Sequence, residues 1–500
     1  MGGSMILSID QGTTGTTCLV IDREGEIRGR GYSEFRQIYP RPGWVSHDAN
    51  EIWDTSLQVV EMALKAAGIS SGDLAVIGIT NQRETVVMWD RETGEPLADA
   101  IVWQCRRTAD LCQQFKSLGL ENQVKTRTGL VLDPYFSATK VVWLLEHVDG
   151  LKARAARGEI CFGTIDSFLL YRLTGGTVHA TEPTNASRTM CYDIHNRIWD
   201  AELMQAFDIP AQVLPEVHPS SGIFGETAGH GDILDPGIPI GGIAGDQQAA
   251  LFGQGAVAEG DVKNTYGTGC FALFQTGETA VASEHGLLTT LACDAHGQAS
   301  FALEGSVFSA GSAVQWLRDG LRIVDSAPET EGLAHSVSDT GGVHLVPAFT
   351  GLGAPHWDPQ ARAALLGVTR GTTQAHVARA ALESIAFQTA DLIDAMVKDA
   401  GQPIHNLHAD GGASANGFLM QFQADILDVP VVLPRHTETT ALGAALLAGL
   451  STGFWEGLSV LEGLNPPDHV YEPKMPQHQR DHLLDGWHRA VDTVRSHGSG

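Results

Sequence analysis

Residues 5–22, with the sequence MILSIDQGTTGTTCLVID, give the clearest indication of the fold. Its apolar and β-branched runs predict strands over 6–10 and 18–22, and the glycines and threonines between them predict a tight turn. A second stretch, DVKNTYGTGCFALF at residues 261–274, has the same order of strand, Gly/Thr turn and strand. The two halves of the chain are therefore expected to open with the same kind of hairpin.

Strand and helix patterns alternate outward from the first hairpin. A third strand is expected across 26–35, and a helix capped by Asp48 or Asn50 is expected to run to about Ala67. Residues 74–80 then predict a buried strand. This alternation is typical of an α/β fold.

The second half repeats the plan at a distance, without a clear residue-by-residue repeat. A strand over 404–409 is followed by a helix over about 414–427, and the long helix predicted over 375–398 is apolar on both faces, as a helix buried between layers would be. We place the domain boundary near residue 253. The expected domains are residues 1–252 and residues 253–500.

The net charge of the chain limits the kinds of partner that it can bind. The 500 residues hold 59 acidic and 32 basic side chains, for a formal net charge of -27 and a pI near 5.0. Broad nucleic-acid and anionic-membrane surfaces need clustered Lys and Arg, so we expect neither kind of partner. The ordinary consequence of such acidity is solubility. One local basic or metal-bridged site could still bind a polyphosphate.

Cysteines and apolar runs indicate the compartment. Seven cysteines at irregular spacing, without a CxxC pair, are typical of a reduced intracellular protein rather than a disulfide scaffold or a zinc site. The longest apolar run, residues 441–450, is too short to span a bilayer. The apolar residues 5–9 are followed directly by Asp10, so this stretch is not a signal peptide. We expect a cytoplasmic protein, with residues 1–4 and 496–500 as remnants of expression.

Residues 10–16, DQGTTGT, hold groups that suit a polyphosphate. Glycines let backbone N–H groups approach phosphate oxygens, and threonine hydroxyls add donors. Asp10, at the end of a strand, could hold Mg²⁺ through water. An ordinary hairpin turn would have the same composition. The chain has no GxxxxGK[ST], which excludes a P-loop.

Two charged motifs follow predicted strands. Asp246 could accept a hydroxyl proton during phosphoryl transfer, or it could cap the helix expected near Gln248. Arg83 and Glu84 could together hydrogen-bond a vicinal diol, because ligands of open α/β sheets lie at the carboxyl ends of strands. The alternative for this pair is a solvated surface contact.

Small and aromatic residues add weaker indications. The glycines after Asp410 could let an adenine or a phosphate lie on the backbone, or they could form a plain strand-to-helix turn. Trp103, Tyr135 and Phe271 could line an apolar slot beside the carbons of a polyol, although aromatic residues are more often part of a core.

Together these motifs resemble the FGGY carbohydrate kinases, from Met5 to about Trp455. Within that family the glycerol-phosphorylating branch is the most similar, because Arg83-Glu84 and the segment around Trp103 look like that branch. Five segments in the same order carry the resemblance: residues 81–85, 101–108, 184–190, 244–253 and 264–271.

The resemblance implies a ribonuclease-H-like, actin-like ATPase fold in both domains, with the active-site cleft between them. It also implies ATP- and Mg²⁺-dependent phosphorylation of glycerol to sn-glycerol 3-phosphate, by in-line transfer with Asp246 as general base, in glycerol uptake and catabolism. Glycerol and ATP or ADP would be the ligands. Similar enzymes form homodimers and homotetramers, so a homo-oligomer is expected.

The resemblance also implies roles for individual residues. Asp10 would organise Mg²⁺, and Asp246 would be catalytic. The expected glycerol contacts are Arg83, Glu84, Trp103, Tyr135, Asp246, Gln247 and Phe271. The expected nucleotide contacts are Thr13, Thr14, Gly15, Thr268, Gly311, Gln315, Gly412 and Asn416.

The sequence departs from the family pattern at two places. Thr17 stands where many bacterial members have an arginine, so one phosphate contact is expected to be missing, with backbone donors and Mg²⁺ left to bind the phosphates. Residues 229–239 lack the arginine associated with fructose 1,6-bisphosphate inhibition, and His230 does not align with the histidine that some members have phosphorylated. We therefore expect neither form of regulation in this protein.

Two other hypotheses stay open from the sequence. The first keeps the kinase chemistry with a ketose or another polyol as substrate. The second is a nucleotide-binding sensor or actin-like assembly protein without kinase activity, which would have no use for Asp246 beside a polyol site.

Overall fold

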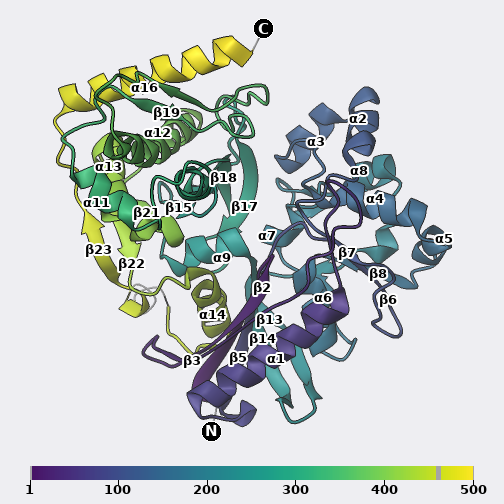
Figure 1. Cartoon of the computed structure of the whole chain (residues 1–500). Helices are drawn as coiled ribbons and strands as arrows, with labels where there is room; N and C mark the ends of the chain where they lie inside the picture. The colour runs from purple at the N-terminus through teal and green to yellow at the C-terminus, as the bar shows by residue number, and fades with distance from the viewer. Residues whose placement is uncertain (1–2, 458–462, 499–500) are drawn as a thin grey trace.

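Two β-sheets with their helices form the two lobes of the computed structural model, which describes residues 3–457 and 463–498. In Figure 1 the second half of the chain, in green and yellow, lies beside the first half, in purple and blue. The outermost of the expected expression remnants, residues 1–2 and 499–500, lie outside the described residues. Among the residues described, no helix has the length and apolar character needed to cross a bilayer.

The first sheet has the strand order β13-β14-β5-β1-β2-β3 and contains the predicted hairpin. Strands β1, β5 and β14 are parallel, with Thr80 of β5 between Asp10 of β1 and Ala244 of β14. Three carboxyl ends therefore meet at one edge of this sheet. The strands are β1 Met5–Gln11, β2 Gly15–Ile21, β3 Ile27–Glu34, β5 Leu74–Asn81, β13 Ser221–His230 and β14 Leu234–Gly245.

The second sheet has the order β17-β18-β16-β15-β21-β22-β23. Its antiparallel β15–β16 hairpin, flanked by the parallel strands β21 and β22, matches the β1–β2 hairpin flanked by β5 and β14. The repeated topology confirms the predicted actin-like plan. The strands are β15 Val262–Tyr266, β16 Cys270–Gly277, β17 Leu288–Cys293, β18 Ala299–Val307, β21 Leu407–Asp410, β22 Val431–Pro434 and β23 Pro467–Tyr471.

Helix ends follow local capping chemistry. Helix α1, Ala49–Ala67, begins after Asp48, whose carboxylate accepts the N–H of Asn50 at 2.9 Å, and ends at Gly68 with φ 70°. Helix α12, Gln374–Ala400, is buried along most of its length, as predicted. Helix α13, Gly417–Leu427, begins three residues later than predicted, because residues 412–415 form a 3₁₀ turn and Asn416 caps the helix.

A helical insertion between β5 and β14 carries several candidate site residues. Most of it packs around its own apolar core, whereas the helix over residues 165–173 belongs to the core beneath the first sheet. Its helices are α2 Ala109–Ser117, α3 Glu121–Thr128, α4 Ser137–His147, α5 Leu151–Ala156, α6 Ile165–Leu173, α7 Pro183–Ala186 and α8 Ala201–Phe207. Its short strands are β6 Val87–Asp90, β7 Ala100–Ile101, β8 Ile160–Gly163, β9 Ala180–Thr181, β10 Tyr192–Asp193, β11 Ile198–Trp199 and β12 Glu216–Val217; β4 Ser46–His47 pairs with β7.

Helix α14, Thr439–Thr452, packs on the first sheet although it lies late in the chain. Glycines permit this close approach: a Cβ on Gly78 of β5 would lie 2.3 Å from the carbonyl oxygen of Ala444. On α14 itself, a Cβ on Gly443 would lie 1.9 Å from the carbonyl oxygen of Ala249 in α9, Asp246–Gly253. The two lobes therefore touch backbone to backbone at this point.

We predict opposite effects for two helical Gly→Ala substitutions. Gly443→Ala should lower the free energy of unfolding by about 1–3 kcal/mol, because the new methyl group has no space. Gly332→Ala in helix α11, Glu329–His335, should leave stability unchanged or raise it by up to about 1 kcal/mol, because nothing lies within 4 Å. Urea unfolding of both variants makes the comparison, and equal effects would contradict the close packing of α14.

Candidate active site

Two carboxylates lie at the shared edge of the first sheet. Asp10 is the last residue but one of β1 and Asp246 follows β14, on either side of β5. Burial, together with the negative charges of Asp246 and Glu438, raises the pKa of Asp10 to about 8. No donor among the described residues hydrogen-bonds the Asp10 carboxylate. An all-oxygen site of this kind fits a hard cation such as Mg²⁺.

The surroundings of Asp246 suit a proton acceptor more than a helix cap. Helix α9 starts at Asp246 itself, with Gly245 as its cap, so the alternative role of Asp246 as a helix cap is wrong, and the helix begins two residues earlier than the expected start near Gln248. The Asp246 carboxylate accepts the N–H of Gln247 at 2.7 Å and lies 3.2 Å from Nε of Arg83. Burial raises its pKa and the Arg83 cation opposes that shift. Its side chain is still 30% exposed, so a ligand can reach it.

Arg83 and Glu84 are buried, so the surface-pair alternative is wrong. Arg83 Nη1 donates to Glu304 Oε2 at 2.6 Å, and Arg188 Nη2 donates to Glu304 Oε1 at 2.8 Å. Arg188 Nε also donates to Glu84 Oε1 at 2.5 Å. Glu84 has φ 61°, an uncommon backbone conformation for a residue with a side chain. Two cations and two anions therefore balance one another beneath Asp246.

Glu304 joins this network from the other lobe, since it lies on β18 of the second sheet. Burial alone would raise its pKa, but Arg188 and Arg83 together lower it to about 2. Its carboxylate therefore stays ionised across the physiological range. The ion network ties the strand-end residues of the first lobe to the second sheet.

Residues 182–188 position several of these groups. The Thr184 hydroxyl donates to Glu182 at 2.6 Å and accepts the N–H of Gly245 at 2.8 Å, which fixes the backbone just before Asp246. Asn185 and Asn81 exchange two amide hydrogen bonds of 2.9 Å, which fix the end of β5. One short segment thus supports both strand ends.

Aromatic side chains lie beside the charged network. Trp103 Nε1 donates to the hydroxyl of Thr13 at 2.9 Å, so the insertion contacts the predicted phosphate turn. Tyr135 meets Trp103 edge to face at 5.6 Å, and the guanidinium of Arg188 lies 5.6 Å from the Tyr135 ring. Phe271 is half-buried on β16 and lies on the same face of the sheet as Glu304, in the neighbouring strand. All three rings are partly accessible; Trp103 and Tyr135 contact each other, and Phe271 lies in the other lobe beside the strand of Glu304.

Gln247 contacts the second lobe. Its amide oxygen accepts from Nζ of Lys263 at 2.6 Å, and Lys263 is fully buried on β15. Burial lowers the pKa of Lys263, while Asp410 and Asp246 oppose that shift. The start of α9 is therefore bonded to both sheets.

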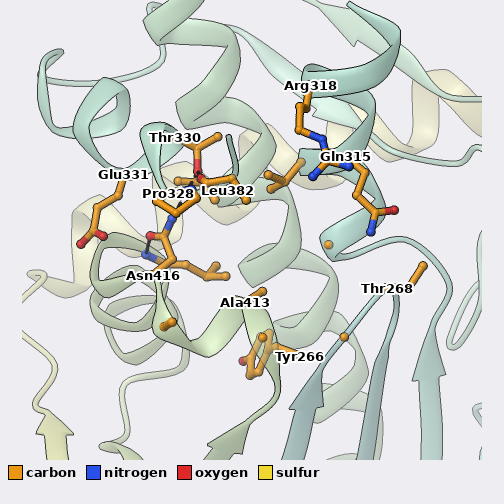
Figure 2. A pocket seen from close by; sticks show the side chains of 17 residues that line it. Tyr266, Thr268, Gln315, Arg318, Pro328, Thr330, Glu331, Leu382, Ala413 and Asn416 are labelled. Atoms are coloured by element: carbon orange, nitrogen blue, oxygen red, sulfur yellow. Dashed lines mark hydrogen bonds between the residues drawn. The ribbon is translucent and has the colours of Figure 1, made fainter. Parts of the chain in front are cut away.

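A separate cavity of about 390 Å³ opens in the second lobe (Figure 2). It lies among β15, α13, α11 and helix α10, Gly311–Gln315. Figure 2 shows Gln315 and Arg318 opposite Thr330 and Asn416, whose amide donates to the Thr330 hydroxyl at 3.3 Å. The five nucleotide contacts expected in this lobe, Thr268, Gly311, Gln315, Gly412 and Asn416, all line this cavity. Thr13, Thr14 and Gly15 lie instead on the first sheet, at the β1–β2 turn.

Two family models match most of the chain. The N-terminal domain of the FGGY family of carbohydrate kinases matches residues 5–253, and the C-terminal domain of that family matches residues 262–452. The chain belongs to the FGGY family of carbohydrate kinases.

Among relatives of this FGGY chain, a glycerol kinase from Trichlorobacter lovleyi is 58% identical over 489 residues, covering 98% of each chain. A glycerol kinase from Azotobacter vinelandii is 54% identical and covers 97% of this chain and 96% of its own. The crystal structure of Plasmodium falciparum glycerol kinase with ADP matches at a TM-score of 0.94 and 38% identity, over 99% of each chain. A xylulose kinase from Lactobacillus acidophilus shares the fold alone, at 22% identity and a TM-score of 0.87 over 98% of each chain.

Two residues of the charged network in this FGGY chain, Arg188 and Glu304, are not among the predicted site residues. Arg188 lies in a segment that carried the family resemblance, yet it was given no role. Glu304 follows an apolar strand pattern with no motif around it. An acidic residue inside a strand of otherwise apolar and small residues was the one available indication, because a buried charge needs a partner.

We predict that Glu304→Gln destabilises the fold by about 3–5 kcal/mol, because it leaves Arg83 and Arg188 buried without their shared anion. The folded-state pKa lies below the ordinary 4.5, so the carboxylate's contribution is fully present above about pH 4.5 and is lost as pH falls toward 2. Urea unfolding at pH 7, 5 and 4 measures the difference from the parent protein.

A surface ion pair supplies the control for Glu304→Gln. Lys152→Met removes the exposed partner of Asp208 and should cost less than about 1 kcal/mol. A similar loss of unfolding free energy in both variants would show that the buried Glu304 network stabilises the fold no more than a surface ion pair does.

Proposed function

We propose that the chain is an ATP-dependent glycerol kinase that makes sn-glycerol 3-phosphate, in glycerol uptake and catabolism. The observation that carries the proposal is the Asp246 carboxylate, which stays accessible beside the buried Arg83–Glu84 network at a strand-end edge. The identity of at least 54% to the two glycerol kinases named above, over nearly the whole chain, supports glycerol as the substrate. The ADP named for the Plasmodium falciparum structure supports an adenine nucleotide as donor.

Glycerol would bind between the charged network and the aromatic rings. Arg83 and Glu84 would hydrogen-bond its hydroxyls, with Asp246 and Gln247 close by, while Trp103, Tyr135 and Phe271 would cover the carbons. ATP would occupy the second-lobe cavity, with its phosphates directed to the turn at residues 13–15. Backbone donors of that turn would bind phosphate even though Thr17 supplies no cation.

The transfer would be in line. The terminal hydroxyl oxygen of glycerol would form the new bond to the γ-phosphorus, the bond to the β–γ bridging oxygen would break, and the hydroxyl proton would pass to Asp246. Because the transition state of such transfers is loose, position matters more than basicity. Mg²⁺ held near Asp10 would neutralise charge on the phosphate oxygens when bound.

Residues 1–252 would form the glycerol-side domain and residues 253–500 the nucleotide-side domain. Their closure would exclude water and limit ATP hydrolysis. The proposed working form is a homodimer or homotetramer in the cytoplasm.

Asp246→Asn should lower turnover on the order of a hundredfold or more, because the amide cannot take the proton, while glycerol affinity should stay within roughly tenfold. A coupled ADP-release assay and glycerol titration measure both. Asp235→Asn at the other end of β14, where the Asp235 carboxylate accepts from the Ser71 hydroxyl at 2.7 Å, should keep normal turnover. Turnover near normal in Asp246→Asn would rule out Asp246 as the base.

The same assay tests the substrate. We expect ATP and Mg²⁺ to phosphorylate glycerol with a higher kcat/KM than dihydroxyacetone, erythritol or xylulose, since the two relatives of at least 54% identity are glycerol kinases. A preference for xylulose would overturn the glycerol proposal, and no product from any of them would favour a nucleotide-binding protein without kinase activity.

A further inference from the structure

A buried lysine lies beneath the Tyr135 turn. Lys140, in the first turns of α4, is fully buried. Its Nζ donates to the carbonyl oxygens of Pro134 at 2.7 Å, Tyr135 at 2.6 Å and Phe136 at 2.9 Å. All three N–H bonds of the ammonium group are therefore used on three successive residues of one turn.

Helix stability does not account for this lysine. A cation near a helix N-terminus faces the positive end of the helix dipole, where an anion would be favoured. No carboxylate among the described residues hydrogen-bonds Lys140, so its direct partners are the three carbonyl oxygens, and the charge of Glu84 stabilises the cation from further away. A buried cation with only carbonyl partners organises the backbone that supplies them.

The turn that Lys140 organises carries a ring of the site. Tyr135 meets Trp103 edge to face and lies beside Arg188, which bonds Glu84. A further bond, from the Ser137 hydroxyl to the carbonyl of Glu84 at 3.1 Å, ties the start of α4 to the same network. Displacement of the turn would therefore move first Tyr135, the ring that this turn carries.

We propose that Lys140 is a positioning residue of the polyol pocket: its buried ammonium holds the carbonyls of residues 134–136 and so fixes Tyr135 against the substrate. This inference rests on the proposed glycerol site. It assigns Lys140 to glycerol binding and leaves nucleotide binding and proton transfer to other residues.

The charge state of Lys140 gives the inference a pH dependence. Burial lowers its pKa to about 7, against the opposing charge of Glu84 and weaker effects of Cys105, Cys112 and Asp133, the titratable groups that face it. Below that pH the ammonium donates to all three carbonyls. Above it the neutral amine has two N–H bonds and turns a lone pair toward the third carbonyl. Glycerol affinity should therefore fall as pH rises through about 7.

The test compares Lys140→Met with Thr139→Ala in the intact protein. Thr139 is equally buried on the same helix, and its hydroxyl bonds Thr108 at 2.9 Å without touching the Tyr135 turn. Lys140→Met should raise the KM for glycerol roughly tenfold or more and change the KM for ATP less than about threefold. The reason is that only the glycerol site loses a pre-organised contact, the one made by Tyr135. Thr139→Ala should change neither, and Lys140→Arg, which keeps the charge and donors, should rescue part of the loss.

An unchanged KM for glycerol in Lys140→Met would overturn the inference, and so would equal rises for glycerol and ATP. If Lys140→Met does not fold, the parent protein decides the matter: its KM for glycerol should rise between pH 6 and 8.5 while its KM for ATP stays flat, and a flat glycerol profile would overturn the inference. Failure of the parent protein to phosphorylate glycerol would instead contradict the proposed function.

Discussion

The carboxylate of Glu304 is the interaction on which the rest of the site depends. It accepts hydrogen bonds from two guanidinium groups, those of Arg83 and Arg188. Both groups are buried, so without this carboxylate their positive charges would repel each other and water could not screen them. Buried ions are costly unless they are paired with good geometry, so each member of the network constrains the position of the others. Because Glu304 belongs to the second sheet and its partners to the first lobe, the shape of the candidate polyol site depends on contact between the lobes.

A second constraint on the site comes from glycines, which have no side chain. Glycines at positions 78 and 443 let α14 and α9 approach neighbouring backbone so closely that a methyl group has no space. This contact lies next to the strand ends that carry Asp10 and Asp246. Close backbone packing on one side and the ion network on the other fix the edge of the first sheet. The side chains that remain accessible there, such as Asp246, are the ones a ligand can reach.

Local sequence predicted the elements well where the evidence was local. The hairpins, α1 with its Asp48 cap and the long buried helix α12 follow from periodicity, turn residues and capping. The start of α13 was placed too early, because a 3₁₀ turn before Asn416 has nearly the same composition as a helix. Asp246 was recognised as a strand-end acid, yet its status as first residue of a helix rather than its cap depends on backbone geometry.

The two α/β halves, the Gly/Thr turns, and the acids and aromatic rings near strand ends could all be predicted from the amino-acid sequence, because each depends on residues that are close together in the chain. Three contacts follow from the folded chain and could not be predicted from the sequence: Glu304 joins Arg83 to Arg188, Thr184 holds the backbone before Asp246, and Lys140 bonds three carbonyls of the Tyr135 turn. The physical reason is that a buried charge or hydroxyl takes its partner from whatever the fold brings within about 3 Å, and that partner can be a hundred or more residues away.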